Sequence, residues 1–279
     1  MKSKTMSARL NNLFHSRICA NPPIIIVGMH RSGTTLLVRL LERAGVFMGH
    51  MQTKNKEASF YQRINKDALD MFGCSWRCLD YLPNNETLRT YPWLKAMILK
   101  RIEKGFILEY CGTRAIGLLF KRFLWGWKDP RNSLLLPVWH QVYPDATVIN
   151  IIRDGRDVAL SLMVRETRRD RKDSNVTDEN AAARFISYVR LWESYVRRIN
   201  EAMPLFIKTY SLKYEQLLAN PSVEFEKLLS ELNIPVRMSI AEIVAIIDPN
   251  RTKRYETNQY SWTKGIVDDL PLLKELHYT

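Results

Sequence analysis

The sequence has few cysteines and no long apolar stretch. Its four cysteines, Cys19, Cys74, Cys78 and Cys111, form no Cys-x-x-Cys pair and stand beside no histidine cluster, so no zinc site is indicated. Buried free thiols in a reducing compartment are expected instead. No apolar run reaches the roughly 18 residues of a membrane span, and segment 1–22 lacks the apolar centre of a secretory signal. We therefore expect a cytoplasmic protein without a membrane span.

Internal repeats, low-complexity tracts and Gly/Ser linkers are also absent, which favours one domain over residues 1–279 with 1–22 as an N-terminal extension. Leu10, Leu13 and Phe14 recur at helical spacing in that extension, so an amphipathic helix that touches a membrane surface stays open. The 42 Lys and Arg exceed the 29 Asp and Glu, for a net charge of +13. Such an excess attracts polyanions in general. Because no zinc finger, RNA-recognition signature or basic repeat is present, a nucleic-acid-binding protein is the weakest alternative.

Short β-branched or apolar runs alternate with segments of helical periodicity. We predict strands at 24–27, 124–128, 147–152 and 205–210, and helices at 34–44, 59–72, 93–109, 133–141, 156–166, 178–202, 214–231 and 237–247. This alternation predicts an α/β fold of three layers, a central parallel sheet flanked by helices. The charge-dense segment 166–177 lacks periodicity and is expected to be an exposed loop.

The first predicted strand leads into a glycine loop. Residues 28–35, Gly-Met-His-Arg-Ser-Gly-Thr-Thr, have the G-x4-G spacing of a phosphate-binding loop and lie between a strand and an amphipathic helix, as that motif requires. Glycine allows successive N–H groups to turn inward, and the helix that begins at Thr34 adds its unpaired N–H groups. The loop therefore predicts a P-loop fold that binds phosphate.

Two residues that a nucleoside triphosphatase needs are missing from this sequence, one in the loop and one after the third predicted strand. A nucleoside triphosphatase has Lys after the second glycine and then Ser or Thr to bind Mg²⁺. Here Thr34 and Thr35 occupy those positions, and the cation comes earlier, from Arg31. The third predicted strand leads into Arg153, where a magnesium site would need an acid. A P-loop kinase or triphosphatase is the nearest rival, but the pattern favours a nucleotide handled without metal.

Two motifs in this order resemble those of the sulfotransferases that use 3′-phosphoadenylyl sulfate. Residues 28–37, GMHRSGTTLL, are similar to their 5′-phosphosulfate loop, and residues 152–161, IRDGRDVALS, to their 3′-phosphate motif. Weaker similarities occur at 126–131 (GWKDPR), 213–217 (KYEQL) and 261–265 (SWTKG). The resemblance, with motifs like those of tyrosylprotein and related bacterial-type enzymes, implies in-line transfer of a sulfuryl group to a hydroxyl or amine acceptor.

The resemblance also implies roles for the matching residues. Arg31 would contact the 5′-phosphosulfate, and Lys128 would donate a hydrogen bond to the bridging oxygen of the leaving nucleotide. Lys128 could instead form a structural ion pair with Asp129 or Glu57. Arg153 and the Ser161 hydroxyl would hold the 3′-phosphate. The remaining nucleotide-binding residues would be Ser32, Gly33, Thr34, Thr35, Tyr214, Lys264 and Gly265.

A neutral hydroxyl acceptor also requires a base that takes its proton. Glu57 is the first choice, because other sulfotransferases carry a Glu in the connection after the first helix; a structural role at a helix N-terminus is its alternative. His30, inside the glycine loop, is the second choice. Residues 165–172, RETRRDRK, could attract an anionic acceptor such as a glycan or an acidic peptide, or could be solvated. The acceptor itself is not identified.

Overall fold

The computed structural model describes residues 21–115, 124–169, 178–236, 238–248, 263, 265 and 270–278. Four parallel strands form one sheet in the order β2-β1-β3-β4. They are β1 (Ile24–Val27), β2 (Gly126–Lys128), β3 (Thr147–Ile152) and β4 (Lys208–Lys213). The predicted parallel sheet is therefore confirmed. Because all four strands run the same way, their carboxyl ends meet at one edge, where α/β proteins bind ligands.

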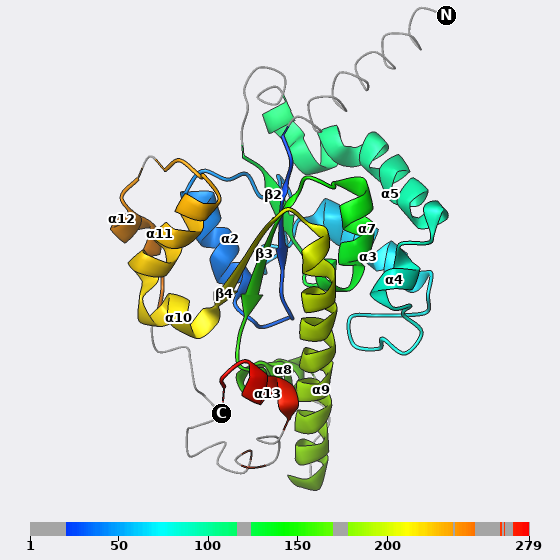
Figure 1. Ribbon diagram of the computed structural model, residues 1–279, viewed down its shortest axis with the longest axis vertical. Coiled ribbons are helices and arrows are strands. Elements are labelled where there is room, and N and C mark those ends of the chain that lie inside the picture. The colour runs from blue at the N-terminus through cyan, green and yellow to red at the C-terminus, as the bar shows by residue number, and fades with distance from the viewer. Residues whose placement is uncertain are drawn as a thin grey trace, which may run out of the picture.

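The strand β1 is covered on both faces. Ile25 and Val27 pack into the larger hydrophobic core on one side of the sheet, whereas Ile24 and Ile26 pack into a second core on the other side. Successive side chains of a strand point to opposite faces, so a strand between two helical layers must be apolar at every position. This requirement explains the uninterrupted β-branched run and makes the sheet the middle of three layers (Figure 1).

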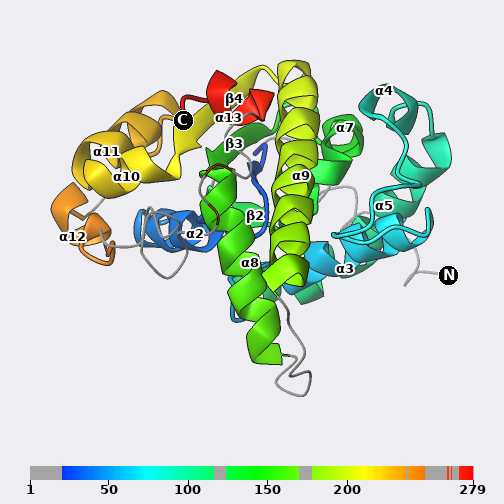
Figure 2. The same cartoon turned by 90° about the horizontal axis from the view of Figure 1, so that it is seen from below.

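The helices divide between the two faces of the sheet (Figures 1 and 2). One side carries α2 (Thr34–Arg43), α10 (Tyr214–Ala219), α11 (Pro221–Glu231) and α12 (Ile240–Val244). The other side carries α3 (Ser59–Asp70), α4 (Asn85–Leu88), α5 (Pro92–Gly105), α7 (Asn132–Val142), α8 (Gly155–Arg169) and α9 (Asp178–Ala202). The last described helix is α13 (Pro271–Glu275). Across the described parts of the chain, no helix has both the length and the apolar character to cross a bilayer.

The strand expected at 205–210 is displaced toward the C-terminus, so that prediction was wrong. Met203–Leu205 forms a 3-10 turn with Pro204 near its start, and β4 begins only at Lys208. The pairing with β3 fixes this register, because Ile152 lies opposite Lys213. The apolar run that predicts a strand belongs largely to this turn and to the residues just before β4.

Two predicted helices are interrupted in the structure. The helix expected at 214–231 is two helices, α10 and α11, because Pro221 starts a new helix at a position where its missing N–H costs nothing. The helix expected at 93–109 ends at Gly105 and continues as a π-helical turn over Phe106–Cys111. The strand expected at 124–128 and the helix expected at 237–247 are shorter than predicted.

Two expectations about burial were wrong. The segment 166–177 is not an exposed loop throughout, because α8 continues to Arg169 and Glu166 is buried. The Glu166 carboxylate accepts hydrogen bonds from Arg184 and Tyr188 of α9, which explains its burial. Among the described cysteines, Cys78 is exposed, although Cys74 and Cys111 are buried and all three are free thiols.

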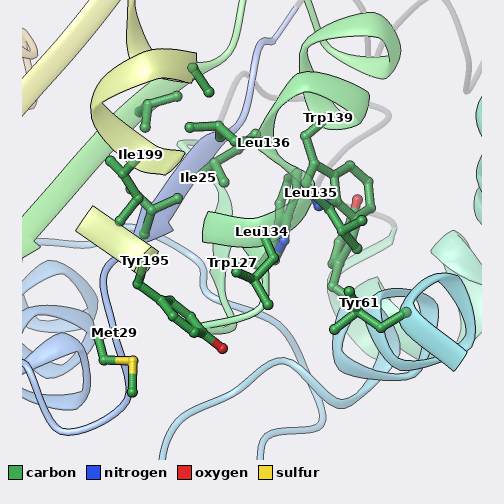
Figure 3. Packing of buried hydrophobic residues seen from close by; sticks show 14 of the residues in the cluster. Ile25, Met29, Tyr61, Trp127, Leu134, Leu135, Leu136, Trp139, Tyr195 and Ile199 are labelled. Atoms are coloured by element: carbon green, nitrogen blue, oxygen red, sulfur yellow. The ribbon is translucent and has the colours of Figure 1, made fainter. Parts of the chain in front are cut away.

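A buried polar network lies beside the aromatic core shown in Figure 3 and supports the glycine loop. The Asn132 side-chain oxygen accepts a hydrogen bond from Trp127 Nε1 at 3.0 Å, and its Nδ2 donates to the Ile26 carbonyl at 3.1 Å. The next residue of α7, Ser133, accepts a hydrogen bond from the Gly28 N–H at 3.0 Å. Buried polar groups are costly unless paired, so these bonds fix α7 against β1 where the loop begins.

Candidate active site

A cavity of about 330 Å³ lies at the carboxyl ends of β1, β2 and β3. Each of these ends contributes one cation to its wall: Arg31 from the loop after β1, Lys128 from the end of β2, and Arg153 directly after β3. Among the described residues, six cationic side chains line the cavity, against two carboxylates. An excess of positive charge inside a low-dielectric cleft attracts an anionic ligand. The three cations that the sequence singled out therefore face one space.

The glycine loop has the backbone shape of an anion nest. Arg31 and Gly33 both have positive φ angles, 73° and 96°, and the α2 helix that begins at Thr34 has no side-chain cap. Its first N–H groups are therefore available to a ligand, and the helix dipole adds positive potential there. A Cβ on Gly33 would lie 2.3 Å from Cδ2 of the Tyr214 ring. The loop thus depends on glycine at this position for two reasons, its backbone angle and the contact with Tyr214.

Arg31 and Arg153 are linked directly. Arg31 Nε donates to Ser161 Oγ at 2.8 Å, and Arg153 Nη1 donates to the Arg31 carbonyl at 3.3 Å. Arg153 Nη2 pairs with Asp157 Oδ2 at 2.8 Å, and its guanidinium lies 4.8 Å from the centre of the Tyr214 ring. The ion pair and the ring hold the Arg153 side chain in one orientation. Ser161 accepts the Arg31 hydrogen bond and lines the same cavity as both arginines.

Lys128 is a buried cation, with 1% of its surface exposed. Its Nζ lies 3.6 Å from Glu57 Oε1 and donates to the Asn55 carbonyl at 2.5 Å. Burial lowers the pKa of Lys128, and the Glu57 carboxylate opposes that shift. Asp129 pairs with Arg131 instead, at 3.1 Å. Lys128 therefore has the ion pair with Glu57 that a structural role requires, and it also lines the cavity.

Glu57 lies in the connection between α2 and α3, two residues before α3 begins at Ser59. It is buried and lines the cavity beside Lys128. Its Oε2 accepts hydrogen bonds from Gln62 Nε2 at 2.5 Å and from Thr53 Oγ1 at 3.3 Å. These bonds, together with the ion pair on Oε1, orient the carboxylate.

His30 is buried in the wall of the cavity, and among the described residues its Nε2 has no hydrogen-bond partner. Its ring lies 4.6 Å from the ring of Trp76, which packs against the Arg165 guanidinium at 4.7 Å. Burial lowers the pKa of His30 well below its ordinary value, and the nearby charges of Arg131 and Arg165 lower it further. These effects favour the neutral imidazole and make it a weaker proton acceptor than an ordinary histidine.

Only some of the other predicted site residues line the cavity. Thr35 lines the cavity, and its hydroxyl donates to the Asn55 carbonyl at 2.9 Å. Thr34 is on the wall as well, but Ser32, although part of the glycine loop, is buried and is not on the wall. Lys264 falls outside the residues that the structure describes. Gly265 is described and exposed, and it is not part of the wall.

The wall also contains charged residues that no motif indicated: Arg39, Lys54 and Asp248. Arg39 follows Thr35 by four residues on α2, so helical spacing alone would have placed both side chains on one face. Lys54 and Asp248 carry no such signal, because loops that are distant in sequence bring them to the site.

The model of the sulfotransferase family matches residues 22–238, more than half of the chain. This match includes the glycine loop, the Lys128 strand, the Arg153 turn and Tyr214. The chain belongs to the sulfotransferase family. The family assignment agrees with the resemblance drawn from the motifs and does not favour the kinase or nucleic-acid-binding alternatives.

Individual proteins give more local similarities. A "Putative protein-tyrosine sulfotransferase" of Caenorhabditis elegans is 32% identical over 112 residues, 39% of each chain, and one of Caenorhabditis briggsae is 29% identical over 107 residues, 38% of this chain and 36% of that one. The matched part thus spans about two fifths of these curated relatives. The sulfotransferase domain from the curacin biosynthetic pathway is 14% identical, with a TM-score of 0.49 over 83% of this chain and 80% of that one.

Proposed function

We propose that the protein transfers a sulfuryl group from 3′-phosphoadenylyl sulfate to a hydroxyl or amine acceptor, by in-line displacement and without a metal ion. One observation carries the proposal. Arg31 and Arg153, from the ends of two neighbouring strands, face one cavity; Arg153 donates a hydrogen bond to the Arg31 carbonyl, and Arg31 donates one to Ser161. Such a pair suits a nucleotide that is charged at both its 5′ and its 3′ end. Membership of the sulfotransferase family supports the same chemistry.

The residues of the cavity fit the two anionic ends of that sulfuryl donor. The uncapped start of α2 and the left-handed backbone at Gly33 suit the 5′-phosphosulfate. Arg153, held by Asp157 and by the Tyr214 ring, suits the 3′-phosphate. A nucleoside triphosphatase would instead have Lys after the second glycine, where this chain has Thr34.

The chemistry follows from these positions. The acceptor oxygen attacks sulfur, the bond from sulfur to the 5′-phosphate oxygen breaks, and adenosine 3′,5′-bisphosphate leaves. Arg31 and Lys128 stabilise the negative charge that develops on the bridging oxygen. Glu57, oriented by Gln62 and Thr53, takes the proton of the acceptor hydroxyl.

Binding of the product nucleotide tests the sulfuryl-donor site. We expect adenosine 3′,5′-bisphosphate to raise the melting temperature in EDTA, with a stabilisation of about 2.7 kcal/mol at a concentration of 100 Kd. Arg153→Ala should weaken this binding by roughly 10- to 100-fold, because one charge-assisted contact is lost. Differential scanning fluorimetry gives both results. Stabilisation by Mg·ATP but not by the bisphosphate would instead indicate a P-loop kinase or triphosphatase.

The base is tested by comparing Glu57→Gln with His30→Gln. We expect Glu57→Gln to lower kcat by roughly 10²- to 10⁴-fold, as for loss of a general base, while His30→Gln keeps most of the activity. Single-turnover assays with labelled sulfuryl donor measure the chemical step. The opposite result, an active Glu57→Gln and an inactive His30→Gln, would assign the proton transfer to His30, which lines the same cavity.

A pH profile separates proton transfer from support of Lys128. The Glu57 carboxylate raises the pKa of Lys128, so Glu57→Gln should lower that pKa further. If Glu57 only keeps Lys128 charged, the activity of the variant recovers as the pH falls, because Lys128 regains its proton. If Glu57 is the base, the activity stays low at every pH. A recovery at low pH would contradict the assignment.

For the acceptor, we propose a hydroxyl of tyrosyl type as the first class to assay, because the curated relatives are named for protein tyrosine. Arg165 on the cavity wall adds a cation that would favour an anionic acceptor, such as an acidic peptide or a glycan. A panel with an acidic tyrosyl peptide, a neutral tyrosyl peptide and a glycan, all with labelled sulfuryl donor, separates these classes. Label in the glycan alone would reject the tyrosyl proposal.

A further inference from the structure

The C-terminal residues 271–278, which we call the C-terminal strap, are attached to the sheet edge that carries the cavity (α13, red in Figure 1). Leu272 and Leu273 of α13 are buried in the larger hydrophobic core. Lys213, the last residue of β4, donates to the Leu276 carbonyl at 2.6 Å and lies 5.1 Å from the centre of the Tyr278 ring. The strap is therefore anchored both by its apolar helix and by the end of β4.

The strap also binds the turn that follows β3. Tyr278 Oη donates to Glu215 Oε2 at 3.1 Å, and Glu215 Oε1 accepts the backbone N–H of Asp154 at 2.9 Å. Arg156 pairs with Asp154 at 2.8 Å and donates to the Tyr278 carbonyl. Asp154 directly follows Arg153, so this network holds the backbone from which the Arg153 side chain extends.

We propose that Tyr278 and Glu215 are positioning residues, through which the C-terminal strap sets Arg153 for the 3′-phosphate of the sulfuryl donor. The inference rests on the proposed function. It rests on two neighbouring residues at the start of α10. The Tyr214 ring packs against the Arg153 guanidinium, 4.8 Å from the ring centre, and the Glu215 carboxylate accepts a hydrogen bond from the Asp154 N–H. One helical start thus fixes both the side chain of Arg153 and the backbone next to it.

The chemistry of Glu215 supports this role. Burial raises the pKa of Glu215, whereas the hydrogen bonds from Asp154 and Tyr278 stabilise its carboxylate. A charged acceptor holds a backbone N–H more firmly than a neutral one does. Loss of the Tyr278 hydroxyl therefore weakens the hydrogen bond between the Glu215 carboxylate and the Asp154 N–H, without removing any group that lines the cavity. The contacts of the strap described above fall on the β3–α8 turn, α10 and the end of β4, so the effect should concern the 3′ half of the site.

Isothermal titration calorimetry on the full chain, with adenosine 3′,5′-bisphosphate and with 5′-AMP, tests the inference. The dissociation constant of 5′-AMP divided by that of adenosine 3′,5′-bisphosphate measures how much the 3′-phosphate contributes to binding. We expect Tyr278→Phe to reduce this ratio roughly three- to tenfold, the range for one lost hydrogen bond. Glu215→Ala should reduce it at least as much. Glu215→Gln should restore part of it, because the amide oxygen can still accept the Asp154 N–H.

Tyr143→Phe is the matched control. Like Tyr278→Phe, it removes a tyrosine hydroxyl that forms a hydrogen bond; the Tyr143 hydroxyl is bonded to Tyr61 Oη at 2.9 Å in the buried aromatic core. This variant should leave the ratio unchanged. An unchanged ratio in Tyr278→Phe and Glu215→Ala, with a wild-type protein that prefers the bisphosphate, would overturn the inference and spare the proposed function. Equal weakening of both ligands would overturn it too. A wild-type protein that does not prefer the bisphosphate would refute the proposed function itself.

Discussion

Lys128→Met is expected to lower kcat by roughly 10²- to 10³-fold, the range for loss of one preorganised group that stabilises developing charge. The dissociation constant of adenosine 3′,5′-bisphosphate should change far less, because the charge at the bridging oxygen is largest in the transition state. Lys128 is positioned for this role by burial, by the Asn55 carbonyl and by Glu57. Single-turnover kinetics and calorimetry of nucleotide binding measure the two quantities.

Lys54→Met is the control, since Lys54 lines the same cavity but is exposed to solvent. It should cost less than about tenfold in kcat, because an exposed charge is screened. Lys128→Met leaves Glu57 buried without its cation, so the variant loses stability as well. The double variant Lys128→Met/Glu57→Gln should recover the melting temperature but not the activity. Normal turnover in Lys128→Met would remove this residue from the mechanism.

Gly33→Ala should impair both the fold and nucleotide binding. The new Cβ would lie 2.3 Å from the Tyr214 ring, at a residue whose φ is 96°. Overpacking and left-handed strain together should lower the free energy of unfolding by about 2–5 kcal/mol. The Tyr214 ring must move to make room, and Arg153 rests on that ring. We therefore expect the affinity for adenosine 3′,5′-bisphosphate to fall by roughly 10- to 100-fold.

Gly45→Ala separates strain from contact. Gly45 has a similar φ of 93°, but a Cβ there would meet nothing within 4 Å. This variant should lose only the strain energy, about 1–2 kcal/mol, and should bind the nucleotide normally. Chemical denaturation and calorimetry on both variants give the comparison. If Gly45→Ala weakened binding as much as Gly33→Ala does, the contact with Tyr214 would not be the cause.

The sequence predicted the β1–loop–α2 unit and β3 well. Ile24–Val27 is buried throughout and consists only of β-branched residues, and Thr147–Ile152 is almost entirely buried and carries only one residue, Asn150, that is neither apolar nor β-branched. The prediction failed for β4. That strand lies at the edge of the sheet and is largely exposed, so its residues carry no apolar run, while the preceding turn does. An apolar pattern in the sequence arises from buried side chains, and an exposed edge strand has few of them.

The motifs alone placed Arg31, Lys128 and Arg153 at strand ends, because the carboxyl edge of a parallel sheet is fixed once the strand order along the chain is known. The local chemistry of the glycine loop, with its missing Lys, already separated this chain from triphosphatases. Only the tertiary structure decided the partners: Glu57 on Lys128, Tyr214 beneath Arg153, and Tyr278 on Glu215. Those pairs join segments that are up to 71 residues apart (Lys128 and Glu57) in sequence, and their contacts depend on how the layers pack rather than on any local pattern.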